Sequence, residues 1–180
     1  MFKKIFSIFI VLFFSQQLLL AEEINVFEFS EEEMETLKVR KIKGKTSYVL
    51  GSNKNGNYLR AEAKGKASGL GKEITINLLK TPFINITWKV EKDLSGVNEN
   101  SKKGHDYAAR VFVIKKTGAT ALSNRAINYV FSSNNLVGEN WPSPYTKKSI
   151  DYVLSTTIKH LGEWVTVKAN VKEHFKKFHD

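Results

Sequence analysis

Alternation of apolar and polar residues, in short segments separated by turn residues, is the feature that most constrains this chain after residue 45. Such alternation is typical of a strand with one buried and one solvated face. In the clearest segment, residues 83–90, Ile84, Ile86 and Trp88 alternate with polar residues. Repeated segments of this kind predict a mainly β fold, an antiparallel β-sandwich of the jelly-roll type. An open sheet covered by helices is the alternative.

Turn residues divide the chain into a series of expected strands. These cover residues 46–51, 58–64, 72–79, 83–90, 106–116, 125–132, 150–158 and 164–168. Between the first two, Asn55-Gly56 suits the positive φ angles of a hairpin turn. The run 106–116 is apolar on both faces, which predicts a central strand paired with 125–132. Residues 65–71 are expected to form a flexible connection, and 136–145, with Pro142 and Pro144, an irregular segment.

Two helices are expected at the ends of this strand-rich region. At the C-terminus Val171, Phe175 and Phe178 recur at helical spacing with lysines between them, which predicts an amphipathic helix. The acidic run 31–33 favours a short helix near the start, since carboxylates stabilise a helix N-terminus.

The first 21 residues have the order of a secretory signal peptide. Lys3 and Lys4 precede an apolar run, and Ala21 precedes two glutamates. Ser15 and the two glutamines after it interrupt the apolar run, so cleavage after Ala21 is favoured over an uncleaved membrane anchor. We therefore expect a periplasmic or secreted bacterial protein, with residues 22–180 forming one domain and no transmembrane segment after cleavage.

The chain is basic, with 28 Lys and Arg against 18 Asp and Glu, and it has no cysteine. Disulfides therefore cannot stabilise the exported fold. A basic exported protein could bind an anionic envelope polymer or lipid surface. The alternative is that the abundance of Lys, Asn and Ile reflects the base composition of the genome. Nucleic acid is not expected as a partner, because no binding motif is present.

Several segments together resemble a known family. These are 104–113 (GHDYAARVFV), 125–131 (RAINYVF), 67–70 (ASGL), 86–90 (ITWKV), 142–146 (PSPYT) and the closing 164–178. In this order they resemble an uncharacterised exported bacterial family, domain of unknown function 3047. The resemblance implies a fold similar to sugar-binding jelly-roll sandwiches, which is an analogy of fold rather than of function.

Polar residues on the expected strands form a first candidate site. Asp106 and Arg110 share a face but lie roughly 13 Å apart at about 3.3 Å per residue, so each needs another partner. The candidates on the next strand are Arg125, Asn128 and Tyr129. We predict that Arg110 and Arg125 share one polar cluster bridged by Asp106 or another acid, either as a structural network or as a ligand site.

Aromatic residues in the Pro-rich segment form a second candidate site. Trp141 and Tyr145 could stack on the C–H faces of sugar rings, and Pro142 and Pro144 would hold them at low entropic cost. The alternative is that Trp141 packs into the core. We expect this segment to lie outside the sheet.

The sequence contains no catalytic signature that we recognise. The acids are scattered, the four histidines lack metal spacing, and no nucleophile elbow or phosphate-binding loop is present. Among these residues, only His105, which is next to Asp106, suggests a catalytic role. We therefore expect no metal, cofactor or assigned catalytic residue, and the favoured function is non-catalytic binding of an envelope glycan or other polar ligand. The alternatives are a hydrolase or lyase acting on cell-wall or polysaccharide material, and a structural partner of another envelope protein.

Overall fold

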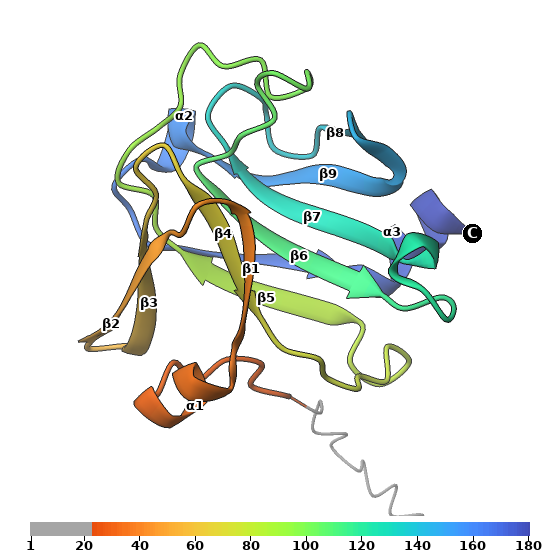
Figure 1. The fold of residues 1–180 in the computed structure, drawn as a ribbon, viewed down its shortest axis with the longest axis horizontal. Coiled ribbons are helices and arrows are strands. Elements are labelled where there is room, and N and C mark those ends of the chain that lie inside the picture. The colour runs from red at the N-terminus through yellow and green to blue at the C-terminus, as the bar shows by residue number, and fades with distance from the viewer. Residues whose placement is uncertain (1–22) are drawn as a thin grey trace, which may run out of the picture.

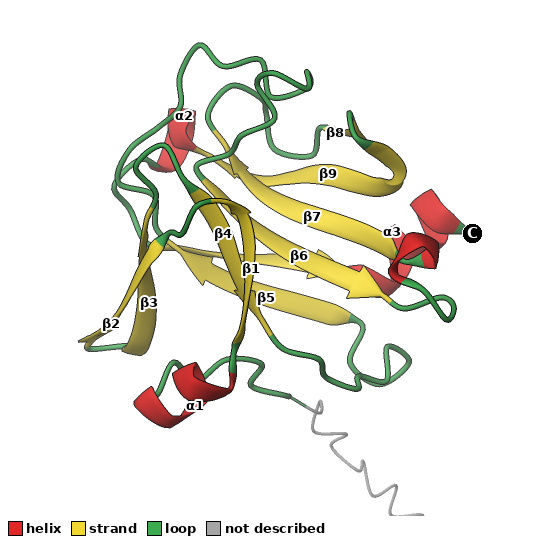
Figure 2. Cartoon of the chain, in the orientation of Figure 1, coloured by secondary structure: helices red, strands yellow, loops and turns green. Residues whose placement is uncertain are grey.

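The computed structural model describes residues 23–180, so the predicted signal peptide lies outside the described residues. The chain is mainly β, and its helices are short and lie at the periphery of the strands (Figure 2). Its largest sheet has four strands in the order β6-β7-β9-β8 (Figure 1). These strands are β6 (Ala109–Lys115), β7 (Arg125–Ser132), β8 (Asn140–Ser143) and β9 (Thr146–Thr156).

Three antiparallel strand pairs complete the β structure. They are β1 (Lys38–Lys43) with β4 (Ala67–Gly71), β2 (Ser47–Asn53) with β3 (Gly56–Glu62), and β5 (Phe83–Trp88) with β10 (Val165–Asn170). The predicted β2–β3 hairpin is confirmed, and Gly56 has the expected positive φ, 118°. Asn55 does not have a positive φ, so only one of the two expected angles is present.

The core lies between the four-stranded sheet and the β5–β10 pair. Tyr129 and Phe131 of β7 are fully buried there, together with Ile86 and Trp88 of β5. The Trp88 indole N–H donates to the Ser155 hydroxyl at 3.0 Å, so its polar atom is satisfied inside the core. The predicted core position of Trp88 is confirmed.

Both expected helices are present. Helix α1 (Glu31–Thr36) begins at Ser30, whose hydroxyl accepts from the Glu33 N–H, as an N-cap does. The C-terminal helix α3 (Val171–His179) buries Val171 and Phe175 against the core, which confirms the amphipathic prediction. The remaining helical segments are η1 (Ala121–Ser123) and α2 (Thr157–His160).

The run 106–116 was predicted to be central, and this is wrong. Strand β6 is an edge strand of its sheet, and Phe112 and Ile114 are 47% and 48% exposed. Apolar residues on both faces of a segment indicate burial on both sides only when a layer covers each face. Here the core covers one face of β6, while Phe112 and Ile114 remain at the surface.

Four other expectations fail. Residues 72–79 form no strand, whereas 67–71, expected to be a flexible connection, form β4. The segment expected to be irregular contains β8, whose Pro142 is tolerated because β8 is an edge strand. The sheets are not wholly antiparallel either, because β7 and β9 pair in parallel.

Helix α3 also carries a histidine that should make stability depend on pH. His174 stacks on the Tyr152 ring, and its Nδ1 lies 3.0 Å from the Tyr129 hydroxyl. Burial lowers the pKa of His174, Lys177 acts in the same direction, and Glu173 opposes them. Below the usual histidine pKa of about 6.5, the unfolded chain therefore binds more protons than the folded protein. The melting temperature should fall as the pH falls through this value.

The matched variants for this prediction are His174→Gln and His160→Gln. His160 lies at the surface beside Glu163, so its replacement should leave the acid-side loss of stability in place. His174→Gln should reduce that loss. A parent protein whose melting temperature is constant between about pH 7.5 and about pH 5.5 would contradict the assignment.

Candidate functional site

The candidate site lies on the outer face of the four-stranded sheet, the face away from the core. One row of paired residues crosses all four strands: Phe112 on β6, Asn128 on β7, Asp151 on β9 and Trp141 on β8. Directly opposed residues share a face of a sheet, so these four side chains point the same way. We call this set the outer-face row.

A neighbouring row is partly apolar and supports the first. Arg110, Val130 and Val153 are opposed across β6, β7 and β9. Val130 and Val153 are fully buried beneath Tyr107, and Trp141 packs against them. Trp141 is thus held in the sheet by packing, so the prediction that its segment lies outside the sheet is wrong.

Asp151 is the centre of the polar part of the site, and its side chain is completely buried. One carboxylate oxygen lies 2.7 Å from His105 Nε2, and the other accepts from the Asn128 amide at 2.7 Å. The Asn128 amide also donates to the Ser149 hydroxyl at 2.8 Å. A buried carboxylate requires such partners, because an unpaired charge in the interior is costly.

Two buried polar atoms of the outer-face row make no hydrogen bond of normal geometry among the described residues, although the Trp141 side chain does interact with that of Tyr107. They are Asn128 Oδ1, an acceptor, and Trp141 Nε1, a donor. Asn128 as a whole is 2% exposed. A buried polar atom left unpaired costs about 1–3 kcal/mol, so this pair indicates a place where a ligand group could bond.

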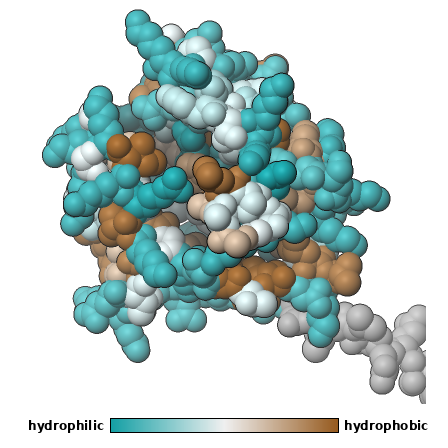
Figure 3. Space-filling model, turned by 45° about the vertical axis from the view of Figure 1, so that its right-hand side comes forward, coloured by the Kyte–Doolittle hydropathy of each residue, from teal (hydrophilic) through white to brown (hydrophobic). Residues whose placement is uncertain are grey.

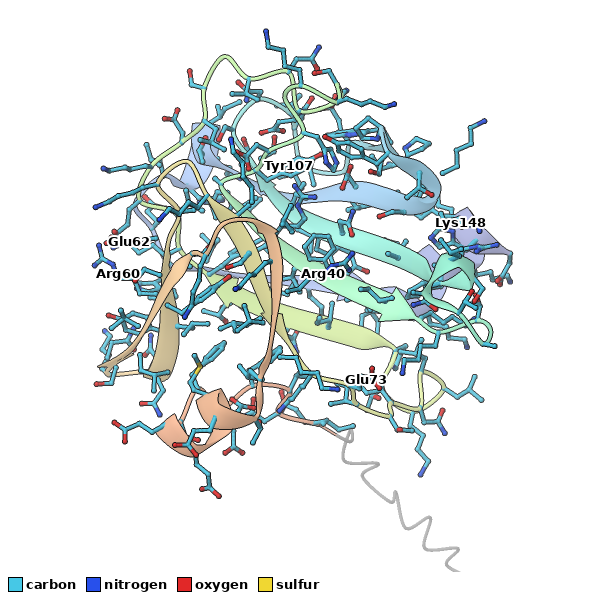
Figure 4. All side chains as sticks on the ribbon, viewed as in Figure 1. Arg40, Arg60, Glu62, Glu73, Tyr107 and Lys148 are labelled. Carbon is cyan, nitrogen blue, oxygen red and sulfur yellow. The ribbon has the colours of Figure 1, made fainter. Side chains whose placement is uncertain are left out.

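The segment before β6, residues 93–107, covers the upper part of the sheet and brings Tyr107 onto it (Figure 4). Tyr107 is 7% exposed. The Arg110 guanidinium carbon lies over the Tyr107 ring, 4.4 Å from the ring centroid. The Tyr107 and His105 rings are in edge-to-face contact. Burial, with the negative charge of Asp151, raises the pKa of Tyr107 well above its usual value, so this phenol stays protonated.

Arg110 is largely buried between two aromatic rings. Its guanidinium carbon lies 4.4 Å from the centroid of the Tyr107 ring and 5.2 Å from that of the Phe112 ring. Desolvation lowers the pKa of Arg110, while the nearby Asp151 carboxylate opposes this change. Its guanidinium donates to the His105 carbonyl at 3.4 Å. Arg110 is therefore a fixed cation beside the Asp151 charge, and an arginine side chain remains charged in a protein.

The covering segment is held in place by the Glu99 carboxylate, which is 1% exposed. Glu99 accepts from the Ser133 N–H at 2.7 Å, from the Asn135 amide at 2.7 Å, and from the Ser132 hydroxyl. Ser132 is the last residue of β7, and Ser133 and Asn135 come directly after it. Glu99 therefore fixes the covering segment to the end of this central strand. Without this anchor the backbone around His105 and Tyr107 would lose its position over the sheet.

The remaining candidate residues occupy different places. Tyr145 is 65% exposed, donates its hydroxyl to the Lys102 carbonyl at 2.9 Å, and meets the His105 ring edge-on. Asp106 is exposed and accepts from the Tyr107 N–H at 3.0 Å. Tyr129 faces the core, and Arg125 donates to the Ser123 carbonyl at 2.7 Å.

The predicted cluster of Arg110 and Arg125 is not formed. Arg110 pairs with Val130, whereas Arg125 pairs with Lys115 at the other end of β7. Val130 and Arg125 are five residues apart in one strand, so they lie on opposite faces and about 17 Å apart. Asp106 bridges neither arginine, because its hydrogen bonds are with the backbone of its own loop.

Sequence reasoning missed three residues of the site: Asp151, Glu99 and Tyr107. The two acids were grouped with scattered, solvated carboxylates, yet both are buried. A signal for Asp151 was present, because a carboxylate between apolar neighbours in a strand requires a buried partner. Its partner His105 was singled out only for its position next to Asp106. Glu99 follows a polar loop pattern, which gives no sign of burial.

Residues 32–180 match the model of a family described as a protein of unknown function, DUF3047. The chain belongs to this family. The match confirms the resemblance and covers all ten strands and the C-terminal helix. No curated protein and no solved structure matches the chain. The DUF3047 assignment thus identifies the family without assigning a reaction or ligand.

Two further observations bear on the site of this DUF3047 member. Within residues 23–180, no group of three or more histidine and acidic side chains is arranged to hold a metal ion. In the same part of the chain, no helix is both long and apolar enough to cross a membrane.

Replacing Glu99 should test whether the covering segment depends on its anchor. Glu99→Ala leaves the buried Ser133 N–H and Ser132 hydroxyl without their acceptor, so the free energy of unfolding should fall by roughly 2–4 kcal/mol. Hydrogen exchange should rise across residues 93–107. Chemical denaturation and hydrogen exchange measure these two effects.

Glu163→Ala is the matched control, because the Glu163 side chain is exposed and lies beside the His160 ring at the surface. It should change the free energy of unfolding by less than about 0.5 kcal/mol. Equal stability of the two variants would contradict the anchoring role of Glu99.

Proposed function

We propose that this DUF3047 member is an exported, non-catalytic protein that binds an envelope glycan on the outer face of its four-stranded sheet. The observation that carries the proposal is the pair of buried atoms that make no hydrogen bond of normal geometry among the described residues, Asn128 Oδ1 and Trp141 Nε1. One is an acceptor and the other a donor. Sugar hydroxyls both donate and accept, so a hydroxyl-rich ligand satisfies the two atoms together.

Exposed aromatic rings beside the outer-face row support this ligand class. Tyr145 and Phe112 are 65% and 47% exposed, and flat rings pack well against the C–H faces of sugars. Trp141 is packed against Val130 and Val153, so it contributes its N–H rather than a free stacking surface. The stacking surface is therefore assigned to Tyr145 and Phe112.

Access to the row depends on Tyr145 and His105. The Tyr145 ring lies against His105, and His105 covers Asp151. Tyr145 is held by one hydrogen bond to the Lys102 carbonyl, at an exposed position. Breaking an exposed hydrogen bond has a small net cost, about 1 kcal/mol, so a sugar that replaces it can displace the ring.

We also propose where the protein is located in the cell and how its chain is organised into domains. A signal peptide over residues 1–21 would send residues 22–180 to the periplasm or the exterior as one domain. We assign to this domain a jelly-roll-like sandwich in which the four-stranded sheet presents the ligand face.

An enzyme is the second candidate, and the His105–Asp151 pair favours it. A carboxylate that orients a histidine is a common part of acid–base and nucleophilic sites. However, the hydrogen bonds of His105 among residues 23–180 join it to Asp151 and Arg110, and neither is a hydroxyl or thiol that a histidine base would activate. Glycan fragments that shorten during incubation with the protein would favour a hydrolase or lyase.

A structural partnership with another envelope protein is the third candidate. Such an interface usually has a contiguous apolar patch of several hundred Å². In Figure 3 the hydrophobic side chains on this side form separate clusters with hydrophilic ones between them. On the face drawn in Figure 3, this distribution favours a polar ligand over a large protein interface.

Two single variants test the glycan proposal without removing the core packing of Trp141. Trp141→Phe keeps a ring but loses the indole N–H, and it should weaken retention on a glycan array by about tenfold. Tyr145→Ala removes an exposed ring and should weaken retention similarly. Trp164→Phe, at a 43% exposed tryptophan beside Tyr58, is the control and should retain the parent affinity.

The array is run at low and high salt. Stacking and hydroxyl bonding should change little with salt, whereas attraction between exposed charges is screened within about 10 Å at 0.1 M salt. The parent should therefore retain the same glycans in both conditions. The proposal would be contradicted if the parent retained no glycan. It would also be contradicted if retention disappeared at high salt and were unaffected by Trp141→Phe, a result that would favour general binding of polyanions.

A further inference from the structure

A hollow lies among α1, β1, β2 and β4, far along the chain from the proposed glycan site. Its volume is about 530 Å³, within the range of about 300–1,000 Å³ typical of small-molecule pockets. Its lining consists of Met34, Leu37, Val39, Lys45, Thr46, Ser47, Tyr48, Lys66 and Leu70. None of these residues belongs to the outer-face row.

One part of the lining is apolar. Met34 and Leu37 come from α1 and the residue after it, and Val39 and Leu70 oppose each other across β1 and β4. Val39 is 46% exposed although it is a large aliphatic residue. Apolar side chains that converge on a hollow from two elements offer a surface for a short hydrocarbon chain.

The polar wall of the hollow is fixed by bonds inside the protein. The Thr46 and Ser68 hydroxyls each accept from the backbone N–H of the other, at 3.0 and 2.9 Å. The Tyr48 hydroxyl donates to the Ser68 carbonyl at 2.5 Å. These three bonds join β2 and the residue before it to β4, so the wall is preorganised.

The mouth of the hollow is cationic. Lys45, Ser47 and Lys66 also line an adjoining space of about 270 Å³, together with Glu62 and Lys64. Glu62 is paired with Arg60 at 3.1 Å. Within the described chain, Lys45 and Lys66 form no ion pair.

One acidic residue of α1 beside this lining, Glu33, does not cancel this charge. Glu33, adjacent to Met34, is paired with Lys72 at 2.5 Å. That bond and two backbone N–H donors offset the burial of Glu33 and lower its pKa, so the pair adds no net negative charge. An anion at the mouth therefore meets the Lys45 and Lys66 ammonium groups, and the Glu62 carboxylate there is already paired with Arg60.

We propose that this hollow binds a small single-chain anionic amphiphile of the fatty-acid type. The hydrocarbon chain lies against Met34, Leu37, Val39 and Leu70, and the carboxylate lies between the Lys45 and Lys66 ammonium groups. Charge complementarity selects the anion, and burial of the chain contributes roughly 0.8 kcal/mol per methylene group. A second macromolecule is not required, because the hollow has the volume of a small-molecule site.

Calorimetric titration of the purified protein with decanoate below its micelle concentration tests the proposal. We expect saturable binding at one site, at least tenfold weaker binding of decanol, and no measurable binding of acetate. The double variant Lys45→Gln/Lys66→Gln should bind decanoate at least tenfold more weakly. The control Lys159→Gln/Lys176→Gln removes the same charge from exposed positions on α2 and α3, and should bind as the parent does.

Circular dichroism melting establishes that each variant is folded. Three results would overturn the proposal: no saturable decanoate binding by the parent, equal weakening in both double variants, or acetate binding as strong as decanoate binding. Salt-sensitive sedimentation with phosphatidylglycerol vesicles, without decanoate binding, would also overturn it and assign the lysines to a membrane surface.

Discussion

Strands β7 and β9 pair in parallel, and both the core and the candidate site depend on the register of that pair. The register places Asn128 opposite Asp151 and Val130 opposite Val153 on the outer face. It also places Tyr129 opposite Tyr152 on the core side. A shift by one residue would move every side chain of β9 to the other face and bring Asp151 into the core. The buried Asn128–Asp151 hydrogen bond therefore helps to specify the register, because an alternative leaves a charge unpaired.

The same pairing explains how a loop becomes part of the site. Parallel strands need a crossover, and here β8 and the turns on either side of it lie between β7 and β9 in sequence. Trp141 thereby returns to lie opposite Asp151, and Tyr145 lies at the following turn beside His105. Glu99 then holds the segment before β6 against the end of β7. The site thus combines two strands set by register with two segments held by specific side-chain contacts.

Much of the strand pattern could be predicted because one-sided burial leaves a visible alternation. The bounds of β7, the inward face of β5 and the helix at the C-terminus follow from it. The partners of each strand could not be predicted, since alternation identifies faces and not neighbours. For this reason 106–116 was assigned to the middle of a sheet, although β6 is at an edge. Of the candidate site, Asn128, Arg110 and the two aromatics of the Pro-rich segment were anticipated. The His105–Asp151 pair was not, because it joins residues 46 positions apart.

The three tryptophans allow ligand binding at the outer-face row to be measured with two internal references in the same molecule. Trp141 Nε1 makes no hydrogen bond of normal geometry among the described residues, Trp88 Nε1 donates to Ser155 in the core, and Trp164 lies beside Tyr58. Proton–nitrogen correlation spectra can follow the three indole N–H signals during titration with soluble glycan fragments released from bacterial envelopes. A ligand hydroxyl that accepts from Trp141 should shift its signal in a saturable way and leave those of Trp88 and Trp164 nearly unchanged. A Trp141 signal that does not move, or a response confined to Trp164, would contradict glycan binding at the outer-face row.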